Sequence, residues 1–209
     1  MEQEIKQKKK NFIRADCQFL PFRSGVFEVV TNVDVLEHLP KGKRIPVLDE
    51  LLRVSRRFVV IAAPFDSKEV RSADSTLYNY ILNILKREDQ NLKEHVTYGL
   101  PNLGELRDFL DLKKLVYLTF SNGYLSNWLS MQMLNFRISS EETYYRVNQL
   151  YNLAFYQGDN REPSYRKILL IDKISKDLSE LLAKTEPIKT REQIAHSPEK
   201  LELFHLIHS

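Results

Sequence analysis

The sequence predicts an α/β fold with a mostly parallel sheet, on the evidence of two apolar runs and the helix between them. Residues 26–32 and 58–63 are rich in Val, Ile and Phe and show little polar alternation, which is typical of strands covered on both faces. A helical stripe separates them. Strand, helix and strand with short connections form a βαβ unit, whose crossover is right-handed. Ligands of such sheets bind beyond the carboxyl ends of the strands.

The first elements come before this unit. Residues 12–15 are β-branched and aromatic and predict a first strand, which runs into a turn at Pro21. Asp34 and Glu37 stand at the spacing of a capping box, so a short helix is expected to begin there and to end before Pro40.

The central helix is predicted over residues 44–55, where apolar residues recur at helical spacing. Pro46 fits this helix because it would lie in the first turn, where its missing N–H is not needed. The strand 58–63 then ends at Pro64.

Later segments follow the same two patterns. Helices are predicted over residues 76–87, 102–110 (capped by Asn102 with Glu105), 125–136 and 142–156, and strands over residues 115–120 and 165–172. A polar helical tail begins at residues 178–182, and residues 185–209 are charged and interrupted by Pro187 and Pro198.

Charge and composition exclude several classes of function. The 31 basic and 28 acidic residues leave a net charge of +3, which the basic arm at the amino terminus already accounts for, so nucleic-acid binding is not expected. The single Cys17 excludes an intrachain disulfide and a multi-cysteine zinc cage. The longest apolar run, residues 58–65, is too short to cross a bilayer, and no signal core follows the start. A cytoplasmic protein without membrane association is expected.

Three segments and their continuation carry a resemblance. Residues 15–22 place an acidic residue ahead of a Leu-Pro-Phe turn, residues 26–32 form the strand, and residues 34–39 (DVLEHL) open the next helix. The helix at 48–54 and a strand ending in Pro at 58–64 follow. This order resembles the middle of a class I S-adenosylmethionine-dependent methyltransferase of the type 11 group. More loosely, the segments around residues 94–98 and 165–173 resemble the lid and the closing antiparallel hairpin strand of such enzymes.

The resemblance implies S-adenosyl-L-methionine as the cofactor. Asp16 would then accept a hydrogen bond from the adenine amine beside the main chain of Cys17, and Asn32, Val33 and Asp34 would line the methionine end. The alternative stays open that Asp16 only caps its turn and that Cys17 is a small buried hydrophobe.

Histidines supply the candidate catalytic group. His38 is placed to touch an acceptor or to act as its base, or else to be a partly buried residue at a helix start. His95 is either a pocket-rim residue or an exposed loop side chain. The spacing of His and Cys predicts no metal site; His205 and His208 could bind a metal but lie in the tail.

The glycine-rich part of the resembled fold is missing from the sequence. Only six glycines occur, none spaced as G-x-G-x-x-G, and no glycine loop or ribose-binding acid precedes Asp16. The expected fold is therefore an incomplete Rossmann-like methyltransferase fold over residues 1–174, mostly parallel with an antiparallel carboxyl-terminal hairpin. Residues 175–209 form a helical or poorly ordered tail.

The strand order of the resembled family indicates where the missing strands would lie. The family order is 3-2-1-4-5-7-6, so the missing strands would lie between residues 12–15 and 26–32, a gap of about 14 Å. The first strand either shifts to pair with residues 26–32 or detaches and leaves an apolar edge. Such an edge would pair with a second copy or a partner chain.

Three hypotheses on function stay open. The chain is a truncated methyltransferase that is inactive alone, a degenerate non-catalytic binding module, or a methyltransferase completed in trans by a partner chain. A small-molecule acceptor is expected but not identified. Aromatic residues of the helix 142–156 either line its pocket or form core: Tyr144, Tyr145, Tyr151, Phe155 and Tyr156.

Overall fold

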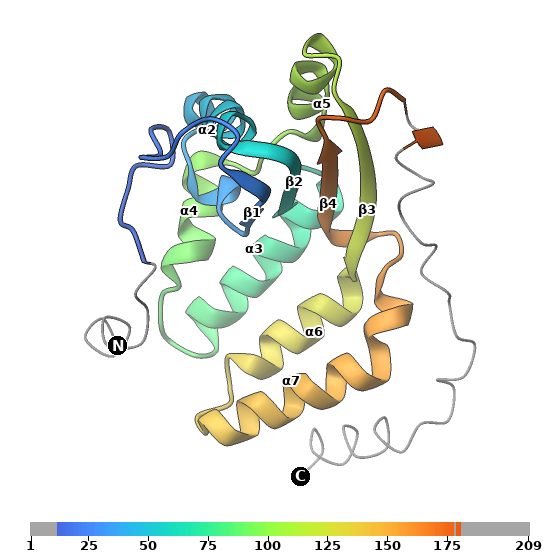
Figure 1. The fold of residues 1–209 in the computed structure, drawn as a ribbon. Helices are drawn as coiled ribbons and strands as arrows, with labels where there is room; N and C mark the ends of the chain where they lie inside the picture. The colour runs from blue at the N-terminus through green and yellow to red at the C-terminus, as the bar shows by residue number, and fades with distance from the viewer. Residues whose placement is uncertain (1–11, 178, 181–209) are drawn as a thin grey trace.

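The computed structural model describes residues 12–177, 179 and 180. Its four-stranded sheet has the order β1-β2-β4-β3 (Figure 1). β1 (Phe27–Val33) runs parallel to β2 (Ser55–Pro64). β4 (Ser164–Asp172) runs antiparallel both to β2 and to β3 (Val116–Tyr124). The α/β class is confirmed. The sheet is mixed, because only the β1–β2 pairing is parallel, and its order is the one that the resemblance implies for strands four, five, seven and six.

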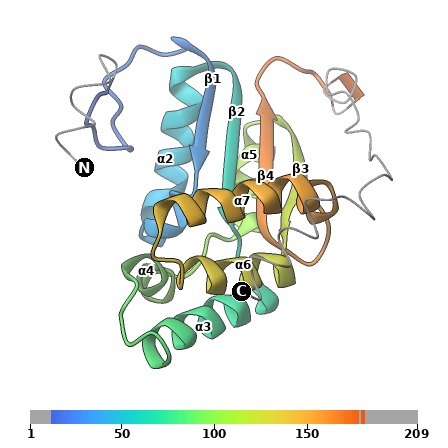
Figure 2. The same cartoon turned by 90° about the horizontal axis from the view of Figure 1, so that it is seen from below.

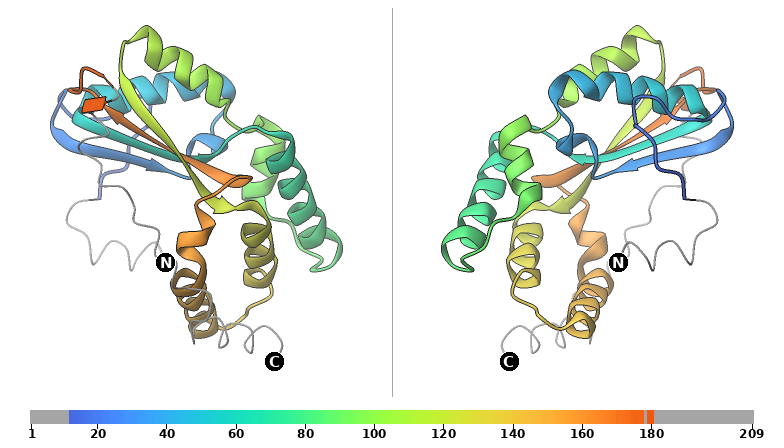
Figure 3. Two further views of the ribbon diagram at one scale, coloured as in Figure 1. Left: turned by 90° about the vertical axis from the view of Figure 1, so that its right-hand side faces the viewer. Right: turned by 90° about the vertical axis from the view of Figure 1, so that its left-hand side faces the viewer.

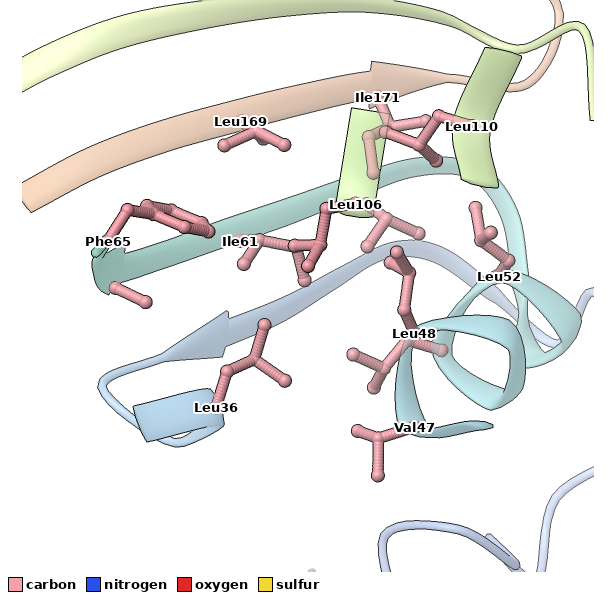
Figure 4. Close-up of a cluster of buried hydrophobic side chains, with 13 residues drawn as sticks. Leu36, Val47, Leu48, Leu52, Ile61, Phe65, Leu106, Leu110, Leu169 and Ile171 are labelled. Atoms are coloured by element: carbon pink, nitrogen blue, oxygen red, sulfur yellow. The ribbon is translucent and has the colours of Figure 1, made fainter. Parts of the chain in front are cut away.

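One face of the sheet is covered by α2 (Lys41–Val54) and α5 (Leu103–Leu112) (Figure 3). Their apolar side chains meet those of β2 and β4 in the main core, which Figure 4 shows in close-up. Its largest fully buried members are Leu36, Leu48, Ile61, Leu106, Leu110, Leu169 and Ile171. The core therefore fixes the sheet and the start of the loop that follows β1.

The remaining helices gather at the end of the sheet to which β1 points (Figure 2). They are the short 3₁₀ helix η1 (Leu36–His38), α3 (Lys68–Asn83), α4 (Gln90–Tyr98), α6 (Leu125–Asn135) and α7 (Glu141–Phe155). Buried residues of α3 and α4 pack against α6 in a second cluster around Leu77, Ile81 and Leu92. A further 3₁₀ turn, η2 (Tyr156–Asp159), precedes β4. The carboxyl ends of β1 and β2 thus face a helical layer.

Most predicted elements are present with shifted ends. α3 begins well before residue 76 because Ser67 caps it, its side chain accepting from the Val70 N–H. α2 begins at Lys41, so the prediction that Pro46 lies in the first turn is wrong and the proline lies further inside the helix. The segment resembling a lid is the helix α4, capped by Asp89. Of the predicted helix at 178–182, only residues 179 and 180 are described, and both are helical.

The aromatic side chains of α7 divide into two groups. Tyr151 and Phe155 pack against a small cluster that contains Val147, as the core interpretation predicted. Tyr144 and Tyr145 are exposed and contribute to no core.

The predicted strand at residues 12–15 is absent, which corrects the sequence analysis. These residues have no regular structure, and Phe12 and Ile13 are exposed. β1 is therefore the edge of the described sheet, and Val29 and Val33 are about half exposed, at 49% and 51%. The expectation that this strand is covered on both faces is also wrong within the described chain, whereas the detached alternative with an apolar edge is confirmed.

Within the described part of the chain, no helix has the length and apolar character that a membrane span requires.

Arg44 joins the loop after β1 to the end of α4. It lies on α2, is almost fully buried, and donates from Nε to the carbonyl oxygens of Leu36 and Leu39, both at 3.0 Å. Its Nη2 donates to the carbonyl oxygens of Tyr98, at 3.4 Å, and Gly99. Burial lowers the pKa of Arg44, but the side chain stays charged because guanidinium titrates far above neutral pH.

Loss of the cap on α5 should destabilise the protein. Asn102 accepts from the N–H groups of Gly104 and Glu105 at 2.8 and 3.2 Å, so Asn102→Ala leaves two helix-terminal donors without this partner. We expect the free energy of unfolding in urea to fall by about 1 kcal/mol. Asn152→Ala, at an exposed position inside α7, is the control and should cause no loss. Equal losses in both variants would contradict the capping role.

Replacement of Arg44 should be more costly. Arg44→Met keeps an unbranched stem but removes the guanidinium donor to the carbonyl groups of Leu36, Leu39, Tyr98 and Gly99. A buried polar group left without a partner costs about 1–3 kcal/mol. We expect the free energy of unfolding to fall by roughly 3 kcal/mol. Lys43→Met, exposed on the same helix, should change it by less than about 0.5 kcal/mol. The same urea midpoint for both variants would show that the Arg44 contacts do not stabilise the fold.

Candidate functional site

The candidate site begins where β1 ends. Asp34 has a positive φ of 52°, and its N–H donates to the Ala62 carbonyl at 2.8 Å, so the chain leaves the sheet in a sharp turn. The Asp34 carboxylate accepts from Arg166 of β4 at 2.8 Å. The capping-box prediction is therefore wrong, because Val35 is the N-cap of η1 and makes no side-chain cap bond. This turn directs Glu37 and His38 of η1 toward α3 and α4.

Two histidine–carboxylate pairs lie side by side at this point. His38 Nδ1 lies 2.9 Å from Oε2 of Glu94, and His95 Nδ1 lies 3.0 Å from Oδ2 of Asp74. The two imidazole rings are 5.2 Å apart. Each carboxylate favours the tautomer with its proton on Nδ1, so Nε2 is the ring nitrogen left for another partner.

The buried pair is held by β4. Asp74 is buried, and its second oxygen accepts from the Tyr165 hydroxyl at 2.8 Å. The Tyr165 ring stacks on Trp128 of α6, with centroids 3.3 Å apart and planes 9° from parallel. Burial, followed by the charge of Asp74, raises the pKa of Tyr165, which therefore stays a hydrogen-bond donor.

Three buried atoms at the site have no hydrogen-bond partner among the described residues: Oε2 of Glu37, Nε2 of His95 and Nε of Arg166. Glu37 is only 2% exposed. Burial raises the pKa of Glu37 to about 7, and the negative charge of Asp34 adds to the rise. A backbone hydrogen bond opposes the rise in pKa, and His95 and Arg166 oppose it more weakly. An unpartnered polar atom in a buried position costs stability.

A cavity of about 270 Å³ opens beside these groups. Its lining combines the titratable residues with aromatic walls: Asp34, Glu37, His38, His95, Trp128, Phe136, Tyr165 and Arg166, among others. Its volume lies just below the usual range of about 300–1,000 Å³ for ligand pockets, so only a small molecule would fit.

The predicted site residues fall into two groups. Asp34 and His38 line the cavity. Asp16 and Cys17 do not; Asp16 is exposed and caps its own turn by accepting from the Gln18 N–H at 2.9 Å, and Cys17 packs half-buried against the main core. Both observations agree with the plainer interpretations of these two residues.

The last two residues of β1 differ from each other. The Asn32 side chain is buried and its Oδ1 has no described partner, whereas Val33 is exposed at the open edge. Neither lines the cavity.

Sequence reasoning missed part of the site. His95 is buried on a helix and lines the cavity, so the exposed-loop alternative is wrong, and Asp74, Tyr165 and Arg166 were not singled out. A signal was available, because the dipeptide Glu-His occurs both at 37–38 and at 94–95. The fold brings the two dipeptides together.

Comparison with known proteins finds distant similarity to solved structures and a family model that matches the first part of the chain. Among solved structures, the MccD protein is 15% identical, with 82% of this chain and 72% of that chain covered and a TM-score of 0.36. The YcgJ protein of Bacillus subtilis is 12% identical, with 81% and 73% covered and a TM-score of 0.42. No curated protein matches. A family model described as a methyltransferase domain matches residues 1–61, a stretch that contains the Leu-Pro-Phe turn and the Leu-Glu-His helix start.

Proposed function

We propose that this chain carries the acceptor side of an S-adenosylmethionine-dependent methyltransferase site, whose cofactor side is completed by further polypeptide laid against β1. The supporting observation is the sheet. The order and the directions of its strands correspond to those of strands four, five, seven and six of the family, and β1 is an open edge. In the family order, the strand that carries the glycine loop lies next to this edge.

The residues present fit one side of the cofactor. Asp16 is exposed and Val33 is half exposed, so a carboxylate and the main chain at the end of β1 are accessible to a ligand. Asp16 would accept from the adenine amine beside Cys17, and Asn32, Val33 and Asp34 would border the methionine end. When bound, the cofactor supplies an electrophilic sulfonium methyl group.

The methyl acceptor would bind in the cavity. A small acceptor held against Tyr165 and Trp128 would be shielded from water and aligned for transfer. His38 would take a proton on Nε2, because Glu94 holds Nδ1 and stabilises the imidazolium that forms. The small cavity favours a small-molecule acceptor over a macromolecule.

Binding of S-adenosylhomocysteine tests this proposal. The full chain should bind it with a dissociation constant weaker than about 0.1 mM, measured by ligand-observed NMR, because only one side of the pocket is present. Asp16→Ala should weaken this binding about tenfold through loss of one hydrogen bond, while Asp108→Ala, exposed on α5, should leave it unchanged.

Two results would contradict the proposal. Micromolar affinity would show that the described chain already forms a complete cofactor pocket. If no binding is detected at several millimolar S-adenosylhomocysteine, the chain does not hold one side of the cofactor. That result would favour a non-catalytic binding module.

A further inference from the structure

We propose that Glu37, His38 and His95 form a binding site for a divalent transition-metal cation of the zinc class. Each residue offers one ligand atom, and these atoms all lie within 4.8 Å of one another. The inference goes beyond methyl transfer and concerns an ion that the chain would bind without cofactor or acceptor; with the ion bound, Nε2 of His38 would be a ligand and would not take a proton.

The first support is the hydrogen bonding of the two histidines. Both imidazoles have a carboxylate at Nδ1, Glu94 for His38 and Asp74 for His95, at 2.9 and 3.0 Å. Histidines that bind a metal through one ring nitrogen almost always donate from the other to a carboxylate or a carbonyl. The arrangement fixes both rings with Nε2 available, and Tyr165 holds Asp74 in turn.

The second support is the pair of buried atoms without partners. Glu37 is 2% and His95 is 8% exposed, and neither Oε2 of Glu37 nor Nε2 of His95 has a described hydrogen-bond partner. Leaving such atoms unsatisfied costs about 1–3 kcal/mol each. One cation between them would satisfy both atoms, since a metal accepts a lone pair from the imidazole and from the carboxylate.

The donor set selects the kind of metal. Two imidazole nitrogens and one carboxylate oxygen suit Zn²⁺ and its transition-metal neighbours, whereas Mg²⁺ and Ca²⁺ prefer oxygen ligands alone. Three protein ligands leave a fourth position for water or a bound molecule. Glu37, His38 and His95 all line the cavity.

Formation of the site requires a small contraction. Tetrahedral zinc with bonds of about 2.1 Å brings its ligand atoms to roughly 3.4 Å from one another. Groups that lie up to 4.8 Å apart must therefore approach by up to about 1.4 Å. His38 is the least buried of the three ligands, with a side chain that is 26% exposed on a one-turn helix, so the adjustment is expected mainly there. Glu37 and His95 are held in place by burial.

Metal titration of the full chain tests the site. After treatment with a chelator, the protein should bind one Zn²⁺ in calorimetry and in competition with a chromophoric chelator. Co²⁺ in its place should give the visible absorption of a tetrahedral centre. Glu37→Gln and His95→Asn should each weaken Zn²⁺ binding at least tenfold, and Asp74→Asn by about 10- to 100-fold through the orientation of His95.

A control variant distinguishes metal binding at this site from metal binding by the histidines of the tail. His205→Asn combined with His208→Asn removes the other histidine pair of the sequence and should leave Zn²⁺ affinity unchanged. Urea midpoints of all variants, measured without metal, show that the loss is not unfolding; Glu37→Gln is close in shape and should fold.

The proposal is overturned if the wild-type chain binds no Zn²⁺ below about 0.1 mM. It is also overturned if the tail variant loses the ion while Glu37→Gln and His95→Asn keep it. Neither result bears on cofactor binding, which is measured without metal.

Discussion

The arrangement of the site depends on one buried guanidinium. Arg44 donates to the carbonyl groups of the η1 turn and to those at the end of α4, so a single side chain of α2 positions both segments that carry a Glu-His dipeptide. A buried charge in this setting is stable only because neighbouring carbonyl dipoles take the place of water. Geometry at the cavity therefore follows from packing in the main core, where the neighbouring residues Val47 and Leu48 hold the same helix against the sheet.

Elements with strong local signals could be predicted from sequence. The cap at Asn102 and the apolar run closed by Pro64 define α5 and β2 by interactions within a few residues. The strand prediction for residues 12–15 was wrong because a strand needs a neighbouring strand, and the described sheet offers none at that place. The exposure of β1 has the same origin: side-chain composition indicates what a strand prefers, whereas the covering layer is a property of the whole fold.

Only half of the candidate site could be inferred in the same way. Asp34 and His38 come shortly after a predicted strand, and they were predicted as site residues because ligands bind at the carboxyl ends of strands. The partners of His95 come from α3 and from β4, far away in the sequence, and no spacing pattern connects them. The capping-box error has a related cause, since Asp34 forms a tertiary ion pair with Arg166 in place of a local bond.

The stacking of Trp128 on Tyr165 gives this protein a natural optical reporter. The sequence contains one tryptophan, so all indole fluorescence arises from a ring in contact with the tyrosine that holds Asp74. A molecule entering the cavity would alter the polarity around that ring and thus its emission wavelength or yield. Occupancy could then be followed in real time with unlabelled material, and any ligand that leaves the emission untouched would be bound at some other place on the surface.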